Sequence, residues 1–199
     1  MHVPIFCYNT YVTKLVFITH PSVEIDEFTP IDQWNLSEEG IEQAQRLSSL
    51  QELSKFDTLY SSPEPKSVTV ALMLSDYYHK LLPIDHKVVG LKEIHGRRFI
   101  PPEIFKEATK MWFDNPTQNP NGWESLKEAQ KRIVFTIENI MSKEKDNTVV
   151  IVGHGGTGTL LKCSIKKVKP VIEEDQSSQG SYFVADWDTR SLVKDWQQY

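Results

Sequence analysis

The chain has 199 residues, of which 39% are hydrophobic and 25% charged, and this composition suits one compact domain with a substantial apolar core. Twenty-two Lys and Arg residues against 27 Asp and Glu give a net charge of −5, which excludes an overall basic field of the kind that gathers nucleic acid or anionic lipid. The two cysteines, Cys7 and Cys163, form no CxxC pair and no Cys/His cluster, so neither a disulfide framework nor a zinc site is expected. Because the N-terminus lacks a signal-peptide pattern and no apolar run reaches membrane-helix length, we expect a cytoplasmic protein without membrane or nucleic-acid partners.

The predicted elements alternate between strands and helices along the chain. Lys14 to His20 is an apolar run rich in β-branched residues and ended by Pro21, which predicts a buried strand. Ser37, followed by two glutamates, predicts the start of an amphipathic helix that extends to about Leu50. The further expected elements are, in chain order, a strand at 56–60, a helix at 68–78, a weaker strand at 86–91, helices at 101–113 and 124–141, a strand at 148–152, a helix at 159–163 and a hairpin formed by strands 180–187 and 191–196.

This order predicts an α/β fold: a three-layer α/β/α sandwich with a mostly parallel central sheet, helices on both faces and a C-terminal hairpin. We expect a single domain over residues 1–199, of which 1–13 form an N-terminal extension.

Two histidines follow two of the predicted strands. In open α/β sheets, ligands bind outside the carboxyl ends of the strands, and both His20 and His154 occupy such a position. Gly155 and Gly156 then lead into the predicted helix, whose free N–H groups and positive dipole end suit an anion. A single histidine at a strand end is more often a structural residue held by a hydrogen bond. The pair beside a helix N-terminus indicates phosphoryl transfer, in which a neutral imidazole attacks phosphorus.

Three motifs in order resemble the histidine phosphatase superfamily, also called phosphoglycerate mutase-like. Leu15-Val-Phe-Ile-Thr-His20-Pro21 is similar to its first strand and Arg-His-Gly motif, Tyr60-Ser-Ser-Pro-Glu-Pro-Lys66 to its Ser-Pro turn, and Val149-Val-Ile-Val-Gly-His154-Gly-Gly to its second histidine motif. Leu91-Lys-Glu93 is similar to the acid-bearing loop, and Gly122 to Ser125 with Arg132 to the start of the long helix. The resemblance covers about Lys14 to Trp196.

The resemblance implies roles for three residues. His20 would be the nucleophile that becomes phosphohistidine, and His154 would contact the transferring phosphoryl group. Glu93 would donate a proton to the leaving oxygen and then take one from water, which requires a pKa raised toward working pH. The alternative for Glu93 is a solvated carboxylate paired with Lys92 or Arg97.

Two departures from the family pattern concern phosphate binding. Thr19 stands where the family has the arginine of its first motif, and Lys66 stands where it has a second arginine. Arginine offers phosphate a planar two-pronged donor, whereas lysine offers one compact charge and threonine a neutral hydroxyl. Arg97 or Arg98 could supply the missing cation. The expected phosphate-binding residues are Thr19, Lys66, His154, Gly155 and Arg97, with no metal and no cofactor.

The leading hypothesis is a metal-independent phosphomonoesterase acting on a small phosphorylated substrate. The alternative is a weakened or inactive relative that binds a phosphorylated ligand or a protein partner, and Thr19 is its main support. A phosphoglycerate mutase is less favoured because the short connector at 116–122 leaves little room for substrate-covering insertions. Nucleotide binding is disfavoured because no GxGxxG or GxxxxGK[ST] motif follows the first strand. Four large aromatic residues either line the crevice or pack in the core: Trp34, Trp112, Phe113 and Trp123.

Overall fold

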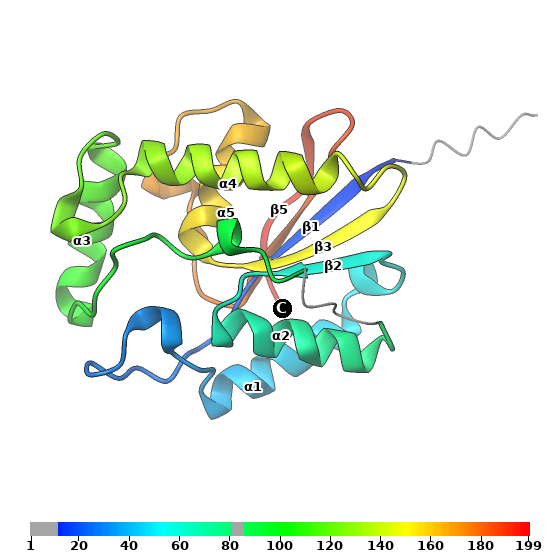
Figure 1. The fold of residues 1–199 in the computed structure, drawn as a ribbon, viewed down its shortest axis with the longest axis horizontal. Coiled ribbons are helices and arrows are strands. Elements are labelled where there is room, and N and C mark those ends of the chain that lie inside the picture. Colours follow the sequence, from blue (N-terminus) through cyan, green and yellow to red (C-terminus); the bar gives the residue numbers. More distant parts are fainter. Residues whose placement is uncertain (1–11, 81–85) are drawn as a thin grey trace, which may run out of the picture.

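The computed structural model describes residues 12–80 and 86–199, which form a five-stranded mixed sheet between two layers of helices (Figure 1). The strand order is β2-β3-β1-β4-β5. The strands β1 (Lys14–Thr19), β3 (Thr148–Gly153) and β2 (Thr58–Ser61) are parallel. The C-terminal hairpin continues the sheet: β4 (Ser181–Asp186) pairs antiparallel with β1, and β5 (Ser191–Gln198) pairs antiparallel with β4. The predicted α/β architecture is confirmed, while the predicted extension at 1–13 lies almost wholly outside the described residues.

The alternation of side chains along β1 divides the core into two layers. Leu15 and Phe17 face a cluster that includes α4 (Leu126–Met141) and α5 (Gly155–Lys166). Val16 and Ile18 face the opposite cluster, with α1 (Glu38–Gln45) and α2 (Pro65–Tyr77). All four side chains are fully buried, as expected for a central strand covered on both faces. Figure 1 shows α4 and α5 on one side of the sheet and α1 and α2 on the other, with α3 (Pro102–Asp114) beyond one end of α4.

Local caps explain where the helices begin. Ser37 accepts a hydrogen bond from the backbone N–H of Gly40, so α1 starts where the sequence predicts. Ser125 and Glu128 form a reciprocal capping box at the start of α4. The helix predicted at 159–163 is longer, because α5 already begins at Gly155. Glycine has low helix propensity, so the first turn of α5 is stabilised by the burial of the residues from Thr157 onward.

The strand predicted at 86–91 is wrong. This segment forms one isolated bridge, between Ser61 and Lys87, and then a short 3-10 helix over Val89–Leu91. At Gly90 an added Cβ would lie 2.1 Å from Oγ1 of Thr136 on α4, so the backbone here packs directly against that helix. Packing against α4 therefore takes the chain away from the sheet edge and buries Leu91.

Within residues 12–80 and 86–199, no helix is both long enough and apolar enough to span a membrane.

Candidate active site

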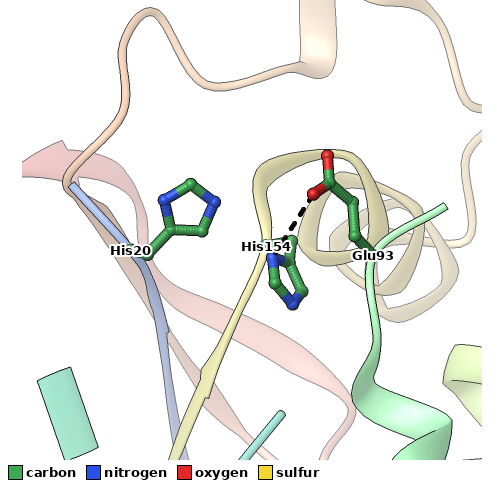
Figure 2. Close-up of side chains that lie close together, drawn as sticks. All are labelled: His20, Glu93 and His154. Carbon is green, nitrogen blue, oxygen red and sulfur yellow. Dashed lines mark ion pairs between the residues drawn. The ribbon is translucent and has the colours of Figure 1, made fainter. Parts of the chain in front are cut away.

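The two predicted histidines meet at the ends of neighbouring parallel strands. Thr19 on β1 pairs with Gly153 on β3, so the residues that follow them, His20 and His154, emerge side by side. Their ring centroids lie 5.3 Å apart with an edge-to-face interplanar angle of 66°. Figure 2 shows the two imidazoles at these strand ends, with Glu93 approaching from a separate segment. Tertiary pairing of β1 with β3 therefore builds the histidine pair.

His20 is held as a neutral imidazole. Its Nδ1 lies 2.9 Å from the carbonyl oxygen of Pro21, and because a carbonyl only accepts, Nδ1 carries the proton. The lone pair is then on Nε2. Burial, together with the positive charge of Lys66, lowers the pKa of His20 to about 3. His20 is therefore neutral at physiological pH, the state in which Nε2 is a nucleophile.

His154 is also buried and neutral. Its Nε2 lies 2.8 Å from Oγ of Ser62, and its Nδ1 lies 4.0 Å from Oε2 of Glu93. Burial lowers the pKa of His154 well below its ordinary value, and His20 and Lys66 add to this effect. Among the described residues, Nδ1 has no hydrogen-bond partner. His154 is 1% exposed and is not among the residues that line the cavity described below.

Glu93 lies between two cations. Its Oε2 is 2.9 Å from Nζ of Lys66, and its Oε1 is ion-paired with Arg97. The backbone N–H of Glu93 donates to Oε1 of Glu64 at 2.8 Å. The predicted proximity of Glu93 and Arg97 is present, and the carboxylate is largely buried instead of solvated.

Arg132 on α4 holds the loop that carries Glu93. Its guanidinium donates to the backbone carbonyl oxygens of Gly90, Lys92 and Glu93 at 2.9 to 3.1 Å. The same group is paired with the carboxylate of Glu124, at 2.6 Å for the shorter contact. One planar guanidinium therefore fixes the loop backbone relative to α4.

Lys66 is buried and fully engaged. Its Nζ lies 2.8 Å from the carbonyl oxygen of Ile31, 2.8 Å from Oε2 of Glu64 and 2.9 Å from Oε2 of Glu93, so each of its three protons has an acceptor nearby. Burial lowers the pKa of Lys66 and raises that of Glu64, and the attraction between the two opposes both shifts. A phosphoryl group would have to take the place of one of these contacts to reach the ammonium group.

Thr19 is linked to Gln176, a residue that the sequence analysis missed. The Thr19 hydroxyl is fully buried, donates to Oε1 of Gln176 at 2.8 Å and accepts from the backbone N–H of Ser181 at 3.0 Å. Nε2 of Gln176 lies against Gly155, where an added Cβ would be only 2.2 Å away. No motif marks Gln176, because it reaches the site from the loop before β4.

A cavity of about 230 Å³ opens beside His20. Of the predicted site residues, those that line it are His20, Lys66, Glu93, Arg97 and Gly155. Thr19 and Arg98 are not among its lining residues, whereas Gln176 and Asp175 are. Burial raises the pKa of Asp175. The wall also contains the aromatic residues singled out in the sequence: Trp34, Trp112, Phe113 and Trp123.

Comparison with known proteins supports the family suggested by these motifs. The sequence profile of the histidine phosphatase superfamily (branch 1) matches residues 27–192. The chain belongs to this superfamily. Its relatives include "Putative phosphoserine phosphatase 2" of Hydrogenobacter thermophilus, which is 29% identical over 157 residues, covering 75% of this chain and 77% of the relative.

Solved structures from the superfamily share the fold. A mycobacterial glucosyl-3-phosphoglycerate phosphatase in complex with inorganic phosphate aligns with a TM-score of 0.71 and 19% identity, covering 93% of this chain and 94% of its own. A phosphoserine phosphatase of Entamoeba histolytica in complex with 3-phosphoglyceric acid aligns with a TM-score of 0.73 and 18% identity, covering 94% and 98%. At these identities the likeness establishes the fold. The profile match begins after His20 and does not include it, so the location of His20 beside His154 is known from the structure and not from the profile.

The candidate site also contains a set of possible metal ligands. His20, Glu93 and His154 each offer one ligand atom, and these atoms lie within 4.8 Å of one another. In a tetrahedral zinc site with bonds near 2.1 Å the ligand atoms are about 3.4 Å apart, so this set would have to contract. A metal ion would also have to displace Lys66 and Arg97 from Glu93. The arrangement therefore fits an anion better than a cation.

Proposed function

We propose that the protein is a metal-independent phosphomonoesterase that acts through a phosphohistidine intermediate on a small phosphorylated substrate. The observation that carries the proposal is the state of His20: a neutral imidazole with its proton on Nδ1 and its lone pair on Nε2, beside a second buried histidine and a carboxyl group. Family membership and the phosphatase names of the relatives support it.

The proposed reaction has two steps. Nε2 of His20 attacks phosphorus, an Nε2–P bond forms, and the bond between phosphorus and the ester oxygen breaks. Glu93 gives its proton to the departing oxygen, which leaves as the alcohol. In the second step Glu93 takes a proton from water, whose oxygen attacks phosphorus. The Nε2–P bond then breaks, releasing inorganic phosphate and restoring His20.

Glu93 must be protonated for the first step, although Lys66 and Arg97 stabilise its ionised form. We infer that a bound phosphate dianion reverses this balance. Its oxygens compete for the two cations, and its negative charge favours the protonated carboxyl group. Substrate binding would thus make Lys66 and Arg97 available to phosphate and, at the same time, favour the protonated form of Glu93 that acts as the acid.

We propose that the phosphoryl oxygens are held by Lys66, Arg97, the first turn of α5 at Gly155, and the amide of Gln176. Thr19 donates to Oε1 of Gln176, which leaves Nε2 with two N–H donors beside Gly155. In this arrangement Thr19 contributes through Gln176, and a neutral amide supplies donors that the family resemblance assigns to an arginine.

The second candidate is a noncatalytic relative that binds a phosphorylated ligand. The pairing of both cavity cations with Glu93 favours it, because the cations are then not free for phosphate in the empty site. The two candidates predict different behaviour of the same substrate: turnover in the first, and saturable binding without turnover in the second.

The test is hydrolysis of 4-nitrophenyl phosphate by the wild-type protein, by His20→Ala and by a control, His79→Asn. His79 is exposed and has a φ of 52°, which asparagine tolerates. We expect His20→Ala to lose at least 100-fold in kcat/KM, and we expect rapid quenching of the wild type to trap an acid-labile, alkali-stable phosphoprotein. Equal rates for wild type and His20→Ala, with no phosphoprotein trapped, would refute the catalytic proposal.

A further inference from the structure

The cavity beside His20 extends under a wall of aromatic side chains. Five aromatic residues line it: Trp34, Phe105, Trp112, Phe113 and Trp123. Three of them lie on α3, Trp123 lies on the connector after α3, and Trp34 lies on the segment before α1. The reacting groups come instead from strand ends and from the loop that carries Glu93. The aromatic wall is thus a separate feature built beside the phosphate position, where the alcohol part of a phosphate ester would lie.

The wall is fixed by hydrogen bonds. The indole N–H of Trp112 donates to the carbonyl oxygen of Glu124 at 2.8 Å, and that of Trp34 donates to the carbonyl oxygens of Asp26 and Thr29, both at 3.0 Å. Trp112 packs edge-to-face on Phe113, with ring centroids 5.2 Å apart. A preformed, rigid apolar surface binds a flat apolar group without the entropy cost of ordering side chains.

The cations of the cavity are committed to the phosphate end. Lys66 and Arg97 are the Lys and Arg residues among its described lining, and both contact Glu93. The Arg97 guanidinium also lies over the rings of Phe105 and Trp123, at 5.0 and 5.5 Å from their centroids, which holds it beneath the wall. A second negative group on a substrate, such as a carboxylate, would find no further Lys or Arg in this described lining. Beside the aromatic rings it would meet the carboxyl group of Asp175 and neutral polar side chains, which are those of Thr109, Gln176, Ser178 and Gln179.

The wall also offers one polar group. Nε1 of Trp123 is buried, with the residue 2% exposed, and has no hydrogen-bond partner among the described residues. Buried donors in folded proteins are rarely left unpaired. An acceptor atom on a bound ligand would satisfy this N–H.

From the aromatic wall, the committed cations and the unpaired indole N–H, we infer that the enzyme selects phosphate monoesters of a neutral, aromatic alcohol and discriminates against substrates that carry a carboxylate. The inference rests on the proposed function and adds the substrate class. It separates this chain from the relatives named as phosphoserine phosphatases, whose named substrate carries a carboxylate.

The experiment compares kcat/KM for benzyl phosphate, ethyl phosphate and phosphoserine, with His20→Ala as the blank. All three leaving groups are alkyl alcohols, so ring binding is separated from the reactivity of a phenol. Burial of one phenyl ring predicts a preference for benzyl over ethyl phosphate on the order of 10- to 100-fold. Phosphoserine is expected to be the poorest of the three.

Phe105→Ala tests the wall directly. Phe105 is 37% exposed, so its truncation leaves the core intact. We expect the benzyl-to-ethyl ratio of kcat/KM to fall by about fivefold or more. The control is Phe135→Ala on α4, which is 66% exposed and is not among the cavity residues, and it should keep the wild-type ratio.

The outcomes separate the two proposals. Hydrolysis above the His20→Ala blank, but with equal kcat/KM for benzyl and ethyl phosphate or with a preference for phosphoserine, overturns the substrate inference and leaves the phosphatase proposal standing. An unchanged ratio in Phe105→Ala likewise overturns the inference. If no ester is hydrolysed above the blank, the proposed function fails and the inference fails with it.

Discussion

The amide of Gln176 provides the sharpest perturbation of the proposed phosphate site. Its Oε1 accepts from Thr19 at 2.8 Å, and its Nε2 lies against Gly155 at the start of α5. Gln176 is only partly buried, so Gln176→Ala removes the amide with little effect on the core.

The magnitude follows from the chemistry of the contact. A hydrogen bond from a neutral donor to a charged acceptor contributes about 1.5 to 3 kcal/mol, which corresponds to roughly 10- to 100-fold in affinity. Gln176→Glu should weaken binding further, because it puts a negative charge where two N–H donors stood. Gly155→Ala should have an effect similar to that of Gln176→Ala, since its Cβ would collide with Nε2.

The assay is the dissociation constant of inorganic phosphate or orthovanadate, measured by titration calorimetry so that turnover is not required. Gly156→Ala is the steric comparison for Gly155→Ala: it adds a methyl group to the same turn and the same cavity, but its Cβ would meet Ile94 at 3.5 Å, an ordinary contact, and would not touch Gln176. Thr19→Ser keeps the hydroxyl and should bind nearly as the wild type does, whereas Thr19→Val should bind more weakly. If Gln176→Ala and Gly155→Ala bind phosphate within twofold of the wild type, the role given to the amide is wrong.

Three further predictions concern the rest of the site. Treatment with EDTA should leave the hydrolysis rate of 4-nitrophenyl phosphate unchanged; loss of activity that returns on adding a divalent metal would contradict the metal-independent mechanism. Arg132→Lys should lower kcat/KM by about tenfold or more, because a lysine cannot bond three carbonyl oxygens and a carboxylate at once, and wild-type kinetics would show that the 93 loop holds its position unaided. The free energy of unfolding should fall on acidification. The pKa of His20 is about 3 in the folded state and near 6.5 in the unfolded chain, so the unfolded chain binds more protons between these pH values. The stability that the neutral His20 contributes is therefore present above about pH 6.5 and is lost as the pH falls toward 3. At pH 5 this loss is about 2 kcal/mol from His20 alone, so denaturant titrations at pH 7 and pH 5 should show a smaller difference for His20→Gln than for the wild type.

The fold class and the positions of the two histidines at strand ends could be predicted from the amino-acid sequence. The inner residues of β1 (15–18) and of β3 (149–152) are all apolar, which favours strands buried on both faces. A histidine follows directly after each of these strands. Ser37 and Ser125 mark helix starts by a purely local hydrogen bond, which is why those boundaries could be read from the chain. The family resemblance rests on the same local motifs.

The groups that surround the two histidines could not be predicted, because they come together only in the folded chain. The error at 86–91 arose because Gly90 packs against Thr136, a contact between residues far apart in the sequence that overrides local strand preference. The partners of Lys66 come from three separate segments, and Gln176 reaches Thr19 across 157 positions of the chain. The neutral state of His20 likewise depends on burial and on the charge of Lys66, and both arise only when the sheet has formed and α2 has packed beside it. Charge and hydrogen bonding at a site depend on distance in space, and local patterns of sequence do not record that distance.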